Sequence, residues 1–88
     1  MMEFKKKYNM MLTSLTVQRL VYGTTEKCSG EVKAENEYDG YSVNAKSVLG
    51  FYSLDLHKPV TITINDENDA KLIEKALDKK NVQYTVVA

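Results

Sequence analysis

Alternation of apolar and polar residues marks two strands in the second half of the chain. In the run Val60–Ile64, apolar side chains alternate with threonines, which suit strand geometry. The run Val82–Val87 shows the same alternation. Both segments are therefore predicted to be strands.

Three further strands are predicted in the first half of the chain. Met2–Met10 alternates well enough to predict a strand at a sheet edge. Val32–Tyr38 and Tyr41–Val43 flank Asp39-Gly40, a dipeptide typical of a two-residue hairpin turn in which both residues take positive φ. We expect these two strands to pair through that turn.

Apolar residues at helical spacing predict three helices. The first follows a cap within Thr13–Ser14 and ends at Ser29–Gly30, where the glycine is free to take a positive φ. A short second helix follows Ser47, and a third begins after Asp66 and ends near Asn81. The element order is then β-α-β-β-α-β-α-β, which predicts one α+β domain over residues 1–88, with an antiparallel sheet and its helices on one face.

The charge balance and the rarity of cysteine and histidine narrow the function classes. Twelve basic residues match twelve acidic ones, so the chain has no basic excess with which to meet nucleic acid, and Lys5–Lys7 is expected to be a solvated edge. One cysteine, Cys28, and one histidine, His57, can form neither an internal disulfide nor a zinc site. We expect no metal and no cofactor. No apolar run approaches the length of a membrane span, so a cytoplasmic protein without membrane contact is expected.

Four segments together resemble the HPr family, the histidine phosphocarriers of bacterial sugar uptake. They are the turn Tyr38–Gly40, the run Tyr41–Gly50, the segment Tyr52–Leu54 and the helix start Asn65–Ala70. The resemblance extends over about Val17–Leu77. It implies an open-faced β-sandwich with strand order 1-4-2-3 and three helices on one face.

The strand Val82–Val87 is an addition to the family pattern. In a hairpin-rich antiparallel sheet, its expected place is beside the first strand, where it would pair antiparallel and cover the Phe4–Tyr8 edge. It could also mediate contact with another chain. We therefore expect a monomer or a weak dimer formed through this strand.

The phosphate-accepting histidine of the family, which stands at the start of the first helix, has no counterpart here. Counting back from Ser47 without gaps places Thr16 at that position, and a shift of one or two residues places Leu15 or Ser14 there. The family arginine that holds the phosphoryl group is displaced by one position to Arg19. A phosphate ester of threonine or serine is a poor donor because its leaving group is an alkoxide. The sequence therefore predicts no catalytic residue and no enzyme.

The resemblance assigns two further roles to the second helix. Ser47 matches the serine that a dedicated kinase phosphorylates in part of the family; its alternative role is a helix N-cap. The segment Val48, Leu49, Phe51 and Tyr52 matches an apolar docking surface; the alternative is that Val48 and Tyr52 face the core. With Thr16 and Arg19, these four residues are the candidate partner contacts.

The leading hypothesis is a non-catalytic HPr-like protein. It would bind protein partners of the phosphoenolpyruvate-dependent sugar phosphotransferase system, or regulators of that system. Two alternatives stay open: a phosphocarrier that uses a non-histidine acceptor, and a structural module that self-associates.

Overall fold

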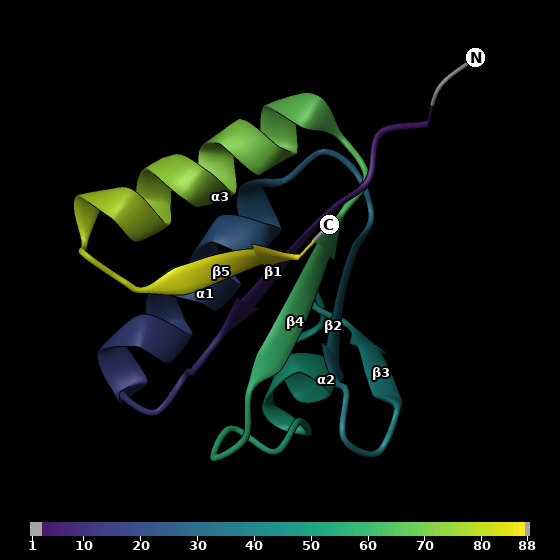
Figure 1. Cartoon of the computed structure of the whole chain (residues 1–88), viewed down its shortest axis with the longest axis vertical. Helices are drawn as coiled ribbons and strands as arrows, with labels where there is room; N and C mark the ends of the chain where they lie inside the picture. The colour runs from purple at the N-terminus through teal and green to yellow at the C-terminus, as the bar shows by residue number, and fades with distance from the viewer. Residues whose placement is uncertain (1–2, 88) are drawn as a thin grey trace.

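The computed structural model describes residues 3–87 as a five-stranded antiparallel sheet covered by helices (Figure 1). The elements are β1 Lys6–Met10, α1 Leu15–Lys27, β2 Val32–Asn36, β3 Tyr41–Asn44, α2 Val48–Tyr52, β4 Val60–Ile64, α3 Glu67–Lys79 and β5 Tyr84–Val87. The sheet order is β3-β2-β4-β1-β5. The expected order 1-4-2-3 and the extra strand beside the first one are both confirmed.

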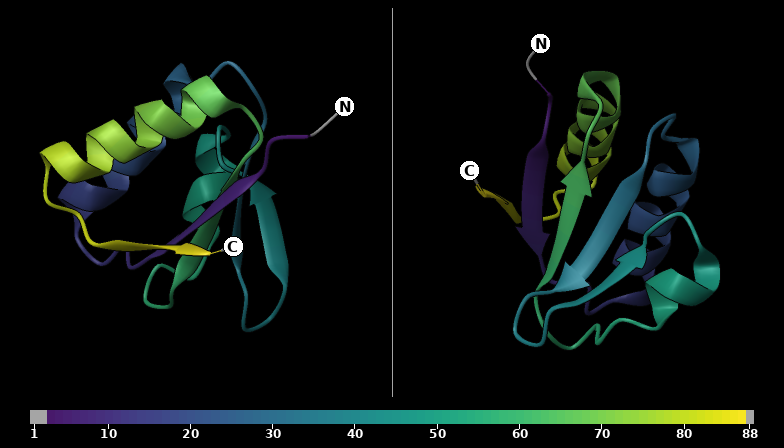
Figure 2. Two further views of the ribbon diagram at one scale, coloured as in Figure 1. Left: turned by 45° about the horizontal axis from the view of Figure 1, so that its top comes forward. Right: turned by 90° about the vertical axis from the view of Figure 1, so that its right-hand side faces the viewer.

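The core lies between the sheet and the helices, which cover the same face of the sheet (Figure 2). Ile62 of the central strand β4 stands between Tyr8 of β1 and Ala34 of β2, and all three side chains are fully buried. From α3, Ile73 and Leu77 pack onto this layer, as the helical spacing predicts. The other face of the sheet has no helix over it, and there the β4 threonines are buried, with Thr61 bonded to Asn9 and Glu37.

The first strand is shorter than expected, and β5 covers its edge, as expected of the last strand. It begins at Lys6, and Phe4 packs against the core from outside the strand. Met2 lies outside the described residues. Because β5 pairs antiparallel with β1, from Lys7 opposite Val87 to Met10 opposite Tyr84, β1 is an inner strand and not an edge. The β5 strand itself begins at Tyr84, two residues later than predicted.

The β2–β3 hairpin differs from the predicted two-residue turn. Asn36 is opposite Tyr41, so four residues connect the strands, and Tyr38 is exposed in the turn. Gly40 has φ +71°, whereas Asp39 is not in the left-handed region. The buried Asn36 amide explains the change, because it donates to the carbonyl oxygen of Asp55 and accepts from its N–H. These bonds fix Asn36 as the last paired residue of β2.

The end of α1 also differs from its prediction. The helix stops at Lys27, and Cys28 follows in an extended conformation with φ −68° and ψ 141°. Gly30 does not take a positive φ. The loop is held instead by Asp69 of α3, whose buried carboxylate accepts from the N–H groups of Ser29 and Gly30 at 2.9 and 2.8 Å. By contrast, Asn81 after α3 has φ +57°, as expected for a residue just past a helix end.

Candidate functional site

Ser14 organises the start of α1, the place where the family's histidine would stand. Its backbone is extended, and its hydroxyl oxygen accepts from the N–H of Val17 at 3.1 Å, so Ser14 is the N-cap. Thr16 is the second residue of the helix and is exposed. Gln18 ties the preceding loop to the helix by donating to the carbonyl oxygen of Leu12 at 2.7 Å.

One side of α1 faces toward α2. Leu15, Arg19 and Tyr22 are spaced by four and three residues, so they share a face of the helix. The ring of Tyr22 lies 5.6 Å from that of Phe51 and 6.3 Å from that of Tyr52. Its hydroxyl donates to the carbonyl oxygen of Lys46 at 3.3 Å. These contacts connect the middle of α1 to α2 through one side chain.

Ser47 begins α2 as an N-cap, as predicted. Its hydroxyl oxygen accepts from the N–H of Gly50 at 3.3 Å, and the side chain is exposed. A Cβ added at Gly50 would lie only 3.1 Å from the carbonyl oxygen of Asn44. A glycine therefore lets α2 approach the end of β3 this closely.

The short helix divides its apolar residues between the core and the solvent. Leu49 is 84% exposed and Val48 is 50% exposed, with Tyr52 also at the surface. Phe51 is fully buried, so it supports the surface from beneath and is unavailable to a partner. This corrects its assignment as a contact. The alternative that Val48 and Tyr52 face the core is also not what the structure shows.

Two hydrogen bonds fix the segment before α2 to the end of α1. The ammonium group of Lys46 donates to the carbonyl oxygen of Cys28 at 2.7 Å. The buried hydroxyl of Thr25 donates to the carbonyl oxygen of Ala45 at 3.0 Å. Neither Lys46 nor Tyr22 was predicted from the sequence to have a role at this site. The spacing Leu15, Arg19, Tyr22 was the one signal in the sequence that could have indicated the latter.

The exposed residues of the two helices form one surface, which we call the α1–α2 face. It consists of Leu15, Thr16, Arg19, Val48, Leu49 and Tyr52. Tyr22, whose ring lies near those of Phe51 and Tyr52, connects the two helices of this face. Partial burial against α2 and the nearby Glu26 carboxylate raise the pKa of the Tyr22 hydroxyl, which therefore stays neutral.

The α1–α2 face contains no histidine. His57 is exposed in the loop between α2 and β4, where its backbone N–H donates to the Asp55 carboxylate at 3.0 Å. Over residues 3–87, no three histidine, cysteine, aspartate or glutamate side chains are arranged to hold a metal ion. The surface offers hydroxyl groups, apolar side chains and one guanidinium.

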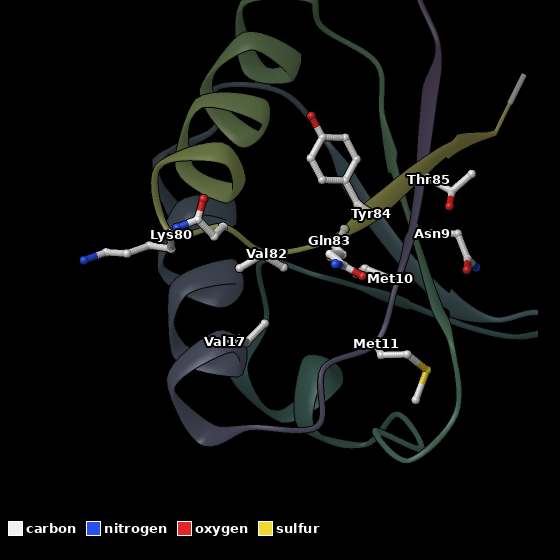
Figure 3. A pocket seen from close by; sticks show the side chains of 10 residues that line it. Asn9, Met10, Met11, Val17, Lys80, Val82, Gln83, Tyr84 and Thr85 are labelled. Atoms are coloured by element: carbon white, nitrogen blue, oxygen red, sulfur yellow. The ribbon is translucent and has the colours of Figure 1, made fainter.

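A groove of about 760 Å³ lies on the other side of the first turn of α1 (Figure 3). Met11 and Val17 line one wall, and the segment from Lys80 to Thr85, which leads into β5, lines the opposite wall. The lining includes no histidine, carboxylate or thiol.

No helix within residues 3–87 is long and apolar enough to cross a membrane. In comparisons with known proteins, no protein-family model matches the chain, and no curated protein matches it significantly.

Proposed function

We propose that this chain is an HPr-like binding module that docks through the α1–α2 face onto protein partners of the sugar phosphotransferase system, or onto its regulators, without relaying phosphate through a histidine. The observation that carries the proposal is the exposure of Val48, Leu49 and Tyr52 on α2, which contacts α1 through Tyr22. The resemblance of Tyr41–Gly50 to the family's docking segment supports it.

Leu49 is the strongest single contact in this proposal. It projects from a helix that Phe51 anchors in the core, so the exposed side chain is held on a fixed support. Burying a leucine side chain against a partner is worth about 1.5–3 kcal/mol. Arg19 at the rim adds a charge that can orient a partner carrying carboxylates.

The chemistry of the α1 start supports binding without relay. A histidine phosphate is a good phosphoryl donor because the protonated imidazole leaves readily. The hydroxyl of Ser14 is occupied in capping the helix, and the hydroxyl of Thr16 would give an ester with an alkoxide leaving group. Either residue would hold a phosphate that it could not readily pass on.

Ser47 is the proposed site of regulation. Its side chain is exposed to a kinase, and phosphate at this position would place negative charge in the middle of the α1–α2 face. Its role as the cap of α2 does not require modification. Modification would therefore change the partner that the face accepts rather than build the face.

Calorimetric titration with purified enzyme I tests the docking proposal. The Leu49→Asp variant should weaken binding at least about tenfold, because it places a charge in the apolar contact. Tyr38→Asp is the matched control, since Tyr38 is an exposed aromatic residue of the β2–β3 turn and is not part of the α1–α2 face. The affinity of this variant should stay within about twofold of that of the unaltered chain. Equal losses for the two variants would contradict the proposal.

A further inference from the structure

The two edges of the sheet are protected to different degrees. At the β3 edge, α2 packs against the end of the strand, and the hydroxyls of Tyr41 and Ser53 are 2.8 Å apart. At the other edge, β5 pairs with β1 and has no further strand beside it within residues 3–87. Along β5, the edge of the sheet is therefore not covered by another strand of the described residues.

The side chains of β5 do nothing to prevent pairing at this edge. Tyr84–Val87 contains no charged residue and no proline, which are the usual means of blocking an edge strand. Val86 is 48% exposed although it lies on the same side of the sheet as the core. Backbone groups and an apolar side chain are therefore both available to a further strand.

We propose that β5 pairs antiparallel with β5 of a second copy of this chain, about a two-fold axis perpendicular to the sheet at Thr85. The two sheets then form one sheet of ten strands with all helices on the same face. A two-fold axis perpendicular to the sheet keeps every side chain on the same face in both copies. Each β5 residue therefore lies opposite a residue of the second copy that points to the same face.

The register centred on Thr85 gives favourable side-chain pairs. Thr85 lies opposite Thr85 of the second copy, and each Tyr84 lies opposite a Val86 on the helix-covered face. Threonine pairs and aromatic–valine pairs are among those that stabilise antiparallel strands. The exposed Val86 side chain is thereby covered by a tyrosine ring.

The self-complementary register selects a second copy as the occupant, and charge does not oppose it. The chain is neutral overall, so two copies do not repel each other. Tyr84 donates to Asp78, which places this side of α3 above β5. That surface carries Lys71, Lys75 and Lys79 together with Glu74 and Asp78, so it presents charges of both signs to a second copy.

Disulfide trapping tests the register directly. In the proposed dimer, directly opposite Cα atoms at Thr85 lie about 4.5–5.5 Å apart, within disulfide range, so Thr85→Cys should form a covalent dimer under mild oxidation. Ser42→Cys is the matched control, because Ser42 is an exposed residue of the opposite edge strand. The native Cys28 adds little background, since it is buried and burial raises its pKa to about 11.

Sedimentation measures the same contact without oxidation. The average mass should rise with concentration toward twice the monomer mass, and Val86→Lys should raise the dissociation constant at least about tenfold. Ser42→Lys should leave it unchanged, and the circular dichroism of each variant shows that it is folded. A chain that stays monomeric up to about 1 mM, or Thr85→Cys that crosslinks no faster than Ser42→Cys, would overturn the proposal.

Discussion

At the residue scale, Asp69 shows how one buried carboxylate can hold two elements together. It is 4% exposed and lies in the first turn of α3, where the helix dipole favours negative charge. Its two oxygens accept from the N–H groups of Ser29 and Gly30 and from the Ser29 hydroxyl. Its own N–H is capped by Asp66. The loop after α1 therefore takes its position from the start of α3.

Removing this carboxylate should be costly for stability. Asp69→Ala leaves two part-buried N–H groups without an acceptor, so the free energy of unfolding should fall by about 3 kcal/mol. Glu67→Ala is the control, because Glu67 is an exposed acid in the same helical turn, and its loss should be about 0.5 kcal/mol. Urea denaturation measures both values. Similar losses for the two variants would show that the carboxylate contributes only its charge near the helix end.

The residue scale also shows which side chains the sequence could not assign. Lys6 interrupts the apolar alternation of its strand and was expected at a solvated edge. It instead bonds Glu74, 68 positions later, at 2.6 Å. Asp69 is read from sequence as a helix-start acid, whereas its partners lie 39 and 40 positions earlier. Periodicity assigns a residue to a face, but the polar partner across the fold depends on tertiary packing.

At the element scale, a small polar cluster joins β1 to α3. The Glu74 carboxylate accepts from the Lys6 ammonium and from the hydroxyl of the buried Tyr8. The hydrogen bond from Lys6, followed by that from Tyr8, holds the pKa of Glu74 below its usual value. The ionised carboxylate therefore stabilises the folded state. That contribution is present above the unfolded-state pKa and is lost as the pH falls through the lower folded-state pKa.

Glu74→Gln should remove this pH dependence. At pH 7 the variant should be less stable by about 1 kcal/mol, a modest amount because the Lys6 and Glu74 side chains are 35% and 31% exposed and water screens the pair. The difference should shrink as the pH falls below the usual glutamate pKa of about 4.3. Unfolding in urea across the acid range measures it. A difference that stays constant down to the lowest pH would contradict the linkage.

The elements that could be predicted are those set by local chemistry. Alternation located β4, and the caps Ser47 and Asp66 were correctly placed because each bonds within its own first helical turn. The β2–β3 turn was wrong because its length depends on Asn36 bonding to Asp55, 19 positions away. The burial of Phe51 and the exposure of Leu49 could not be predicted from the sequence either. The five residues of α2 are too few for their apolar positions to define a buried side of the helix.

At the scale of the whole molecule, the two proposed contacts use separate surfaces. The sheet order places β3 and β5 at opposite edges, and α2 packs beside β3 (Figure 1). Pairing through β5 therefore leaves the α1–α2 face of each copy free. A dimer would present two docking faces. Binding of one face to a partner would favour binding of the other face to a second partner held within its reach.

Phosphotransfer in a competition format tests the central claim most directly. Enzyme I, labelled phosphoenolpyruvate and a histidine-containing phosphocarrier are mixed with and without this chain. This chain should slow labelling of the phosphocarrier by occupying enzyme I, while it takes up no label itself. Acid-labile label on this chain, acid-stable label on Ser14 or Thr16, or an unchanged labelling rate would each contradict a docking module without a relay.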